Sequence, residues 1–196
     1  MRILLVLAHP LEDSFAAAVA KTAEETLIAG GHQVDLLDLY REGFDPRLSE
    51  AERRGYFDQP YDTSGVADIV ARLQAADGLI LVFPQWWFNF PAILKGFFDR
   101  AFAPGIAFSH DAAGGRIVPK LTNIRLFWAL TTTGSPWWIV HLYMGNPVRR
   151  LLRQAARFPH ADTARHGSRD RGRTPGSSRP RQESLGCSLN PRWRSC

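Results

Sequence analysis

An apolar strand that runs directly into an aromatic loop and a helix is the feature that most constrains the fold. Residues 79–83 (LILVF) form a continuous apolar run, which is typical of a strand covered on both faces. Residues 84–90 then place two Trp and two Phe in a seven-residue loop, and Pro91 opens a helix. Rings of this size are costly to leave in water, so they either plug a core or line a ligand site. The loop alone leaves both readings open.

The rest of the first 156 residues alternates between strand and helix patterns. Further strands are predicted at residues 3–8, 33–40 and 124–130. Helices are predicted over residues 15–29 with Ser14 as N-cap, 49–56, from Thr63 or Ser64 to 77, and 137–156 with an interruption near 145–147. A Gly-rich excursion at residues 104–121 is predicted to form a hairpin or lid. The alternation favours an α/β fold, an open, doubly wound parallel sheet with helices on both faces.

Three strand–loop–helix units have loops at residues 9–14, 84–91 and 131–136, all after the carboxyl ends of strands, where open α/β sheets bind ligands. In the first loop, free N–H groups of the helix that follows Ser14 attract an anion, and His9 adds a donor. The plainer reading is that Ser14 only caps the helix and His9 only ends a strand. Taken together, the loops offer phosphate binding, a flat aromatic slot and polar edge contacts, which a flavin nucleotide requires.

Charge and composition exclude several classes of protein. Residues 1–156 contain 15 Lys and Arg against 16 Asp and Glu, so this part shows no electrostatic footprint for nucleic acid. No apolar run approaches the ~20 residues of a membrane span, and no signal peptide is recognisable, so we expect a cytoplasmic protein without membrane insertion; peripheral association stays open. Rossmann, P-loop and GxSxG motifs are absent, and neither the scattered His nor Cys187 and Cys196 have metal-site spacing, so no metal is expected.

The last forty residues do not continue this pattern. Residues 157–196 contain nine Arg and three acids, no Ile, Val, Met or Tyr, and only eight hydrophobic residues. One reading is a basic, disordered tail that binds nucleic acid or an acidic partner. The other is a frameshift or gene-model error near Arg157, because a sheet of this kind would have a fifth strand and a closing helix here. We therefore separate a domain at 1–156 from a tail at 157–196.

The three loops also carry a family resemblance. Residues 83–102, FPQWWFNFPAILKGFFDRAF, are similar to the stretch FP-x-x-W-[FW]-x-x-P-A-x-L-K-G-[FW]-[FL]-[ED]-R of the flavodoxin-like NAD(P)H:quinone oxidoreductase family. His9 with Ser14 and Phe15 matches the first flavin loop of that family, and residues 131–135 (TTTGS) resemble the third. The resemblance covers residues 1–156 and implies the flavodoxin-like fold.

The resemblance implies an enzyme, an NAD(P)H dehydrogenase (quinone), that works as a homodimer with non-covalent FMN or FAD. In its ping-pong reaction NAD(P)H passes a hydride to the flavin and leaves, and a quinone or similar acceptor then takes both electrons. By position, the implied cofactor-binding residues are His9, Ser14, Phe15, Pro84, Gln85, Trp86, Trp87, Phe88, Asn89, Thr132, Thr133, Gly134 and Ser135. The implied substrate-binding residues are Trp87, Phe108 and His110.

The chain departs from the family after the third loop. Better-known quinone reductases have a Tyr and a His there that assist hydride transfer, whereas this chain continues as Pro136-Trp137-Trp138. His141 is the candidate for a catalytic role, with packing or solvent exposure as the alternative. Two other functions remain open: a one-electron carrier like the flavodoxins, which are usually far more acidic, and an ancillary subunit of a potassium efflux system.

Overall fold

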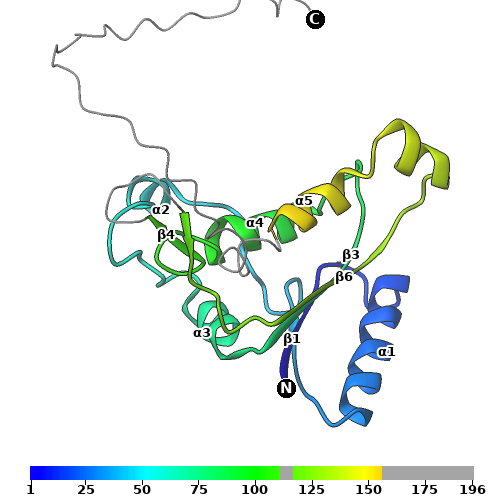
Figure 1. Ribbon diagram of the computed structural model, residues 1–196, viewed down its shortest axis with the longest axis horizontal. Helices are drawn as coiled ribbons and strands as arrows, with labels where there is room; N and C mark the ends of the chain where they lie inside the picture. The colour runs from blue at the N-terminus through cyan, green and yellow to red at the C-terminus, as the bar shows by residue number, and fades with distance from the viewer. Residues whose placement is uncertain (111–116, 156–196) are drawn as a thin grey trace, which may run out of the picture. The chain divides into compact units, whose positions relative to one another are not determined.

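The computed structural model describes residues 1–110 and 117–155 of the chain (Figure 1). The chain divides into two units, Met1–Ala164 and Arg165–Cys196, and the second lies wholly outside the described residues. The prediction of a tail at 157–196 therefore falls outside the described part, and so does the Gly-rich tip of the excursion at 111–116.

A four-stranded parallel sheet organises the described residues. Its strands are β1 (Arg2–Leu7), β2 (Gln33–Asp38), β3 (Gly78–Pro84) and β6 (Leu126–Thr132), in the order β2-β1-β3-β6. The predicted parallel sheet is thus confirmed. The last strand begins at Leu126 rather than at residue 124, because Arg125 is bound to Asp77, which lies just before β3. The backbone N–H of Arg125 donates to the carbonyl of Asp77 at 2.8 Å, and its guanidinium pairs with the Asp77 carboxylate at 3.0 Å.

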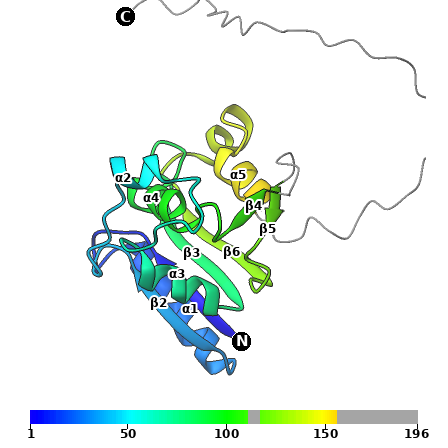
Figure 2. The same ribbon diagram turned by 90° about the vertical axis from the view of Figure 1, so that its left-hand side faces the viewer.

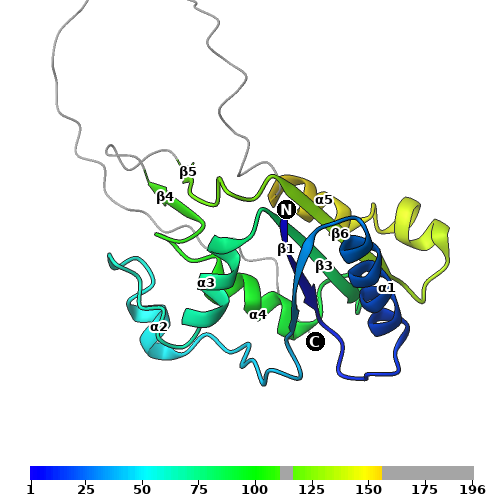
Figure 3. The ribbon, with the colours of Figure 1, turned by 90° about the horizontal axis from the view of Figure 1, so that it is seen from below.

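Helices cover both faces of this sheet. They are α1 (Phe15–Ala29), α2 (Glu50–Arg54), α3 (Ala67–Ala75), α4 (Ala92–Ala101), the π-helix η1 (Ile139–Tyr143) and α5 (Pro147–Ala155). Figure 3 shows α1 on one side of the strands and α3 and α4 on the other. The first helix has the predicted bounds, and the hydroxyl of Ser14 accepts from the N–H of Ala17 at 3.1 Å as an N-cap should.

One helix prediction needs correction and another is refined. Helix α3 begins at Ala67, because residues 62–66 form a turn in which the N–H of Ser64 donates to the Asp62 carboxylate at 2.9 Å. The helical stretch predicted over 137–156 has its predicted interruption, and the structure adds that the part before it contains a π-helix. Gly145 and Asn146 separate the two parts with φ angles of 64° and 48°, left-handed values that no α-helix can contain.

Alternate residues of β1 pack into two different cores. Ile3, Leu5 and Leu7 face α1, where the small side chains of Ala16 and Ala20 let the helix approach closely. Leu4 and Val6 face the core beneath α3, α4 and α5. This period of two is what a strand buried on both faces requires. Because β1, β3 and β6 pair in parallel, their carboxyl ends lie at one edge of the sheet.

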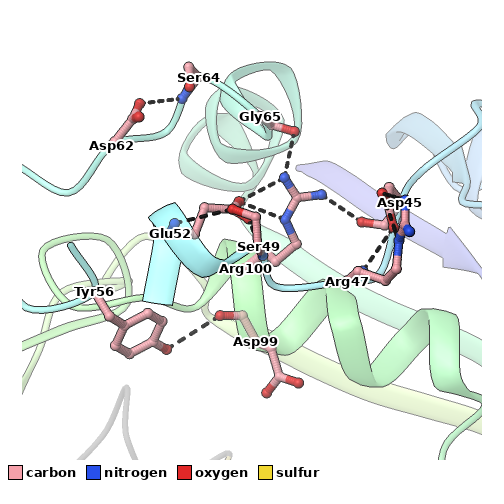
Figure 4. Close-up of polar contacts among 10 residues, drawn as sticks. All are labelled: Asp45, Arg47, Ser49, Glu52, Tyr56, Asp62, Ser64, Gly65, Asp99 and Arg100. Carbon is pink, nitrogen blue, oxygen red and sulfur yellow. Dashed lines mark hydrogen bonds and ion pairs between the residues drawn. The ribbon is translucent and has the colours of Figure 1, made fainter. Parts of the chain in front are cut away.

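A buried ion pair ties the long connection after β2 to α4 (Figure 4). Arg100 is only 7% exposed; its Nε donates to Glu52 Oε1 at 2.8 Å, and its two other nitrogens donate to the carbonyls of Asp45 and Gly65 at 2.6 and 3.3 Å. Glu52 also accepts from the N–H of Ser49 at 2.8 Å, which completes a capping box on α2. We call these five residues the Arg100 cluster.

The predicted hairpin is present and lies at the edge where the strands begin. It consists of β4 (Phe108–His110) and β5 (Ile117–Pro119), which pair antiparallel (Figure 2). The chain enters it from the end of α4 and leaves it towards the start of β6. Just beyond, the side chain of Asn123 donates to the carbonyls of Leu73 and Ala76 at 3.0 and 2.8 Å, which holds the connection at this edge.

Candidate functional site

The three predicted loops lie together at the carboxyl edge of the sheet. Their strands β1, β3 and β6 are neighbours and parallel, so the loops that leave them are neighbours too. The first loop leads into α1, whose opening N–H groups at Phe15 and Ala16 have no acceptor within the helix. Together with the helix dipole, these groups make the start of α1 suitable for an anionic group.

The first and second loops touch through His9 and Trp86. Their rings meet edge to face, with centroids 5.9 Å apart. Nδ1 of His9 lies 3.1 Å from the backbone nitrogen of Leu11 and 3.3 Å from its carbonyl oxygen, and the tautomer of the ring decides which of the two it bonds. His9 is therefore held in place by its own loop and by the second loop.

The centre of the second loop is a tight turn with an unusual backbone, which we call the aromatic turn (residues 86–89). The N–H of Trp86 donates to the carbonyl of Asn89 at 3.1 Å, and the N–H of Asn89 donates back at 3.0 Å. Trp87 and Phe88 have φ angles of 52° and 57°. Such angles suit Asn and Gly in a turn of this kind; for other residues they cost on the order of 1–3 kcal/mol each. One of the two strained residues, Trp87, is also 95% exposed, and this combination of backbone strain and an uncovered ring points to a function for the turn.

The second and third loops are joined by backbone. Thr132 is the register partner of Pro84, and its carbonyl accepts from the N–H of Gln85 at 2.7 Å. In the third loop the N–H of Ser135 donates to Oγ1 of Thr133 at 3.3 Å. Within the described residues and apart from its two chain neighbours, no atom lies within 4 Å of the position that a Cβ on Gly134 would occupy, so a ligand has room to approach the backbone there.

A cavity of about 450 Å³ lies beside these loops, between β6 and the η1–α5 segment. It is lined by Gln85, Thr131, Thr133, His141, Asn146 and Arg149, together with apolar residues and Arg153. The side-chain oxygen of Gln85 is buried and has no hydrogen-bond partner within the described residues. A buried amide oxygen without a donor costs about 1–3 kcal/mol, so Gln85 marks a place where a donor from outside this part of the chain fits.

The residue proposed for catalysis, His141, borders the same cavity. Its Nδ1 lies 3.0 Å from the carbonyl oxygen of Trp137, and its ring stacks on the Trp137 ring at 4.8 Å with 16° between the planes. These contacts fix the orientation of the ring, and its role in catalysis stays a prediction. Sequence reasoning missed Asn146 and Arg149 as lining residues; the only signal was the break in the helical pattern at residues 145–147.

Three predicted side chains lie apart from this cluster. The Phe15 ring is 72% exposed and lies in a groove against β6, so only its backbone faces the first loop. Phe108 and His110 are on the hairpin, where their rings meet edge to face at 6.0 Å. The hairpin lies near the edge where the strands begin, opposite to the edge that carries the three loops. Within residues 1–110 and 117–155, these two rings therefore make no contact with the three loops.

Neither a metal centre nor a membrane span is recognisable in the described part of the chain. No group of three or more His, Cys, Asp or Glu side chains is arranged there to hold a metal ion. Among the same residues, no helix has the length and apolar character needed to cross a bilayer.

Comparison with known families identifies the chain. Residues 1–166 match the model of Flavodoxin_2, described as a flavodoxin-like fold. The chain belongs to this family. Membership confirms the expected fold, with its parallel sheet, flanking helices and loops at the carboxyl edge.

Relatives of this Flavodoxin_2 chain include named oxidoreductases. It is 35% identical over 150 residues to NAD(P)H dehydrogenase [quinone] 1 of Cavia porcellus, covering 68% of this chain and 54% of the relative. It is 38% identical over 109 residues to the uncharacterized NAD(P)H oxidoreductase YcaK of Escherichia coli, covering 55% of each. The chain thus spans about half the length of these curated relatives.

A solved structure supports the fold alone. The FMN-dependent NADH-azoreductase of Bacillus anthracis, determined in complex with FMN, superposes with a TM-score of 0.62 at 18% identity. The match covers 81% of this chain and 81% of that one.

Proposed function

We propose that this chain is a flavin-dependent NAD(P)H oxidoreductase that passes two electrons to a quinone or a similar small acceptor. The observation that carries the proposal is the aromatic turn, which holds two aromatic residues in left-handed conformations and leaves Trp87 95% exposed between two other ligand-binding loops. Relatives named for the reduction of quinones with NAD(P)H support the same assignment.

The three loops fit a flavin nucleotide. The start of α1 has free N–H groups and a positive dipole end for a phosphate, and His9 on the same loop offers a further polar side chain. Trp87 offers an uncovered flat ring, which a planar ring system of similar size can cover. The buried side-chain oxygen of Gln85 finds no donor in the part of the chain that the structure describes, and a ring N–H would satisfy it.

In this assignment each loop has a separate task. His9, Ser14 and the amides of Phe15 and Ala16 hold the phosphate side, while residues 84–89 line the isoalloxazine and present backbone N–H groups to its polar edge. Thr132, Thr133 and Gly134 reach the pyrimidine end, where their donors stabilise negative charge. The bound flavin supplies the redox chemistry, accepting an electron pair from NAD(P)H and giving it to the acceptor. FMN and FAD both fit these contacts.

The hairpin favours a homodimer as the working unit. Phe108 and His110 lie at the opposite edge of the sheet from the loops, so they reach a flavin site only if it belongs to another copy. We propose that a second copy brings them over the exposed ring of Trp87 and completes the acceptor site. In the same assignment His141 lies beside the site as the candidate for proton transfer.

The test is to purify the full chain, load it with FMN or FAD, and follow NADPH and NADH oxidation with menadione as acceptor. We expect a bound flavin band that bleaches with NAD(P)H and recovers when menadione is added. Thr133→Ala should lower turnover, whereas Thr122→Ala, an exposed Thr at the other edge, should not. Absence of a flavin band after reconstitution would refute the proposal, and a flavin band without NAD(P)H oxidation would favour an electron carrier or a regulatory subunit.

A further inference from the structure

The cavity beside the three loops has two unlike walls. On the side of the sheet its lining includes Gln85 and Thr133, which are uncharged and belong to the loops assigned to the flavin. On the side of η1 and α5 its lining includes Asn146, Arg149 and Arg153. No Asp or Glu is among the described residues that line it. The cavity therefore extends from the flavin loops to two guanidinium groups, and its wall is positively charged.

The two arginines share one face of α5. Arg149 and Arg153 are four residues apart in this helix, so their side chains lie one turn above the other. Like charges at this spacing weaken a helix, and an anion bound between them removes the repulsion. Val148 and Leu152 of the same helix are buried in the core beneath α3 and α4, which fixes the rotation of α5 about its axis. The pair is therefore held at the cavity by the packing of the helix.

Other arginines of the chain have a structural partner. Arg72 and Arg100 lie 2.8 and 2.7 Å from a carboxylate oxygen of another segment. Within residues 1–110 and 117–155, neither Arg149 nor Arg153 forms an ion pair with a carboxylate. The wall of the cavity thus carries positive charge that the described part of the chain does not balance, and an anionic group of a ligand fits there.

A phosphate monoester matches this pair better than a carboxylate does. It carries a charge of about −1.5 to −2 at pH 7 and three acceptor oxygens, enough for two guanidinium groups. Each planar guanidinium can donate two parallel hydrogen bonds to phosphate. The electron donor of the proposed function has two forms, and NADPH differs from NADH by one such phosphate, on the 2′-oxygen of a ribose; an arginine is the side chain that accommodates it.

We propose that Arg149 and Arg153 bind the 2′-phosphate of NADPH and make this chain select NADPH over NADH. The inference rests on the proposed function, because the nicotinamide end of the donor has to lie at the flavin loops. Asn146 adds to the site. Its side-chain oxygen accepts from the backbone N–H of Arg149 at 3.2 Å, which leaves its NH2 group as a further donor beside the pair.

The kinetic test compares NADPH and NADH as donors for the flavin-loaded full-length chain, with menadione as acceptor. We expect kcat/KM to be about tenfold higher for NADPH. Arg149→Gln and Arg153→Gln should each lower the NADPH-to-NADH ratio roughly threefold, through the KM for NADPH, since each removes one charged donor that is exposed to solvent. An equal kcat/KM for both donors in the wild type contradicts the proposal.

Arg150→Gln is the matched control. Arg150 carries the same charge on the same helix and is exposed, but it does not line the cavity, so its loss should leave the NADPH-to-NADH ratio unchanged. Arg149→Lys should lower the ratio less than Arg149→Gln does, because Lys keeps the charge and loses only the planar fork. If Arg150→Gln lowers the ratio as much as Arg149→Gln, the helix attracts NADPH only through its overall charge, and the proposal is wrong.

A binding test separates the failure of this inference from the failure of the proposed function, because it needs no turnover. Isothermal titration calorimetry of the full-length chain, with and without FMN, compares adenosine 2′,5′-bisphosphate with AMP, which lacks the 2′-phosphate. The wild type should bind the bisphosphate about tenfold more tightly, and Arg149→Gln but not Arg150→Gln should reduce that difference. Equal affinities, or binding of neither compound, overturn the inference even if the chain oxidises NAD(P)H. A tenfold difference in a chain that oxidises neither donor supports the phosphate site and refutes only the enzyme assignment.

The same variants test two other sources of an anion. If Arg149→Gln weakens the binding of FMN, the cavity holds the phosphate of the flavin. If it raises the KM for 1,2-naphthoquinone-4-sulfonate but not for menadione, and the NADPH-to-NADH ratio stays as in the wild type, the anion belongs to the acceptor. Either result contradicts the proposal.

Discussion

The Arg100 cluster and the three-loop edge show how differently a structural and a functional polar site are built. The cavity beside the Arg100 cluster is larger, about 630 Å³ against about 450 Å³ beside the loops. Within the cluster, each guanidinium nitrogen of Arg100 has an acceptor and both carboxylate oxygens of Glu52 accept hydrogen bonds. At the loop edge, the buried side-chain oxygen of Gln85 has no donor within the described residues, and Trp87 is uncovered. The buried hydroxyl of Tyr61, near the Arg100 cluster, also lacks a partner among these residues, but no uncovered ring or left-handed turn accompanies it.

The loop edge is distinguished from the larger cavity by a combination: an unpaired buried group, an uncovered Trp ring and a turn in an unfavourable conformation lie together there. Satisfied polar groups hold a chain in one arrangement, as the Arg100 cluster does for the connection between β2 and α4. Groups left unpaired, together with a turn held in an unfavourable backbone conformation, need a partner from elsewhere. The predictions below test this difference, beginning with the largest expected effect.

Arg100→Met should cost the most stability. It leaves the carboxylate of Glu52, 12% exposed, without its buried partner, a loss of about 3–5 kcal/mol in the free energy of unfolding. Urea denaturation measures it. Arg54→Met is the matched control, because Arg54 pairs with Glu50 on the surface and should change stability by less than ~0.5 kcal/mol. Equal losses in the two variants would show that the Arg100 cluster contributes no more to the free energy of unfolding than a surface ion pair does.

Trp87→Ala should have the opposite profile. Flavin affinity should fall roughly three- to tenfold because a stacking surface is lost, while stability should not fall, since the ring is 95% exposed. Phe57→Ala is the control, because it also removes an exposed ring but lies in the connection between β2 and α3, outside the three loops. It should leave flavin affinity unchanged. Fluorescence titration with FMN measures both variants, and an unchanged affinity for Trp87→Ala would remove Trp87 from the site.

Trp87→Asn separates strain from contact. Asn tolerates a φ of 52° better than Trp does, so the free energy of unfolding should rise by roughly 0.5–1 kcal/mol while flavin affinity falls. Thermal unfolding of the flavin-free protein gives the first value and titration gives the second. A variant less stable than wild type would mean that the turn is not strained.

Acid should weaken the Arg100 cluster by a smaller amount. Burial acts to raise the pKa of Glu52, but hydrogen bonds from Ser49 and Arg100 outweigh it and hold that pKa below its ordinary value of 4.5. A carboxyl with a lowered folded-state pKa contributes stability above its unfolded pKa and loses it as pH falls through the folded pKa. Wild type should therefore lose its advantage over Glu52→Gln below about pH 4.5, as urea unfolding across pH 3–6 would show. An advantage that is constant across this range would contradict the assignment.

The sequence predicted those features of the structure that depend on neighbouring residues, and missed those that depend on residues far apart in the chain. The bounds of α1 and its cap at Ser14 follow from neighbouring residues alone, and β3 follows from an unbroken apolar run. The left-handed turn at Trp87 and Phe88 could not be predicted, because neither residue prefers that conformation; in the structure the turn is closed by reciprocal hydrogen bonds between Trp86 and Asn89. The burial of Arg100 was equally hidden, since its partners lie about fifty residues earlier and an Arg in an amphipathic helix reads as a surface residue.

The alternation of strands and helices correctly predicted that the three loops lie at one edge of the sheet, but neither it nor the resemblance could place the hairpin. Phe108 and His110 were assigned to the acceptor site from their positions in the sequence, and the topology puts them at the far edge of the same sheet. That assignment now depends on the homodimer proposed above.

The most direct test of the central claim is a titration of the flavin-free full-length chain with FMN and with FAD, followed by visible absorption and by quenching of Trp fluorescence. The account predicts saturable binding of one flavin per chain, with quenching that is smaller in Trp87→Ala and unchanged in Phe57→Ala. Binding of neither flavin, or binding that does not depend on Trp87, would contradict it.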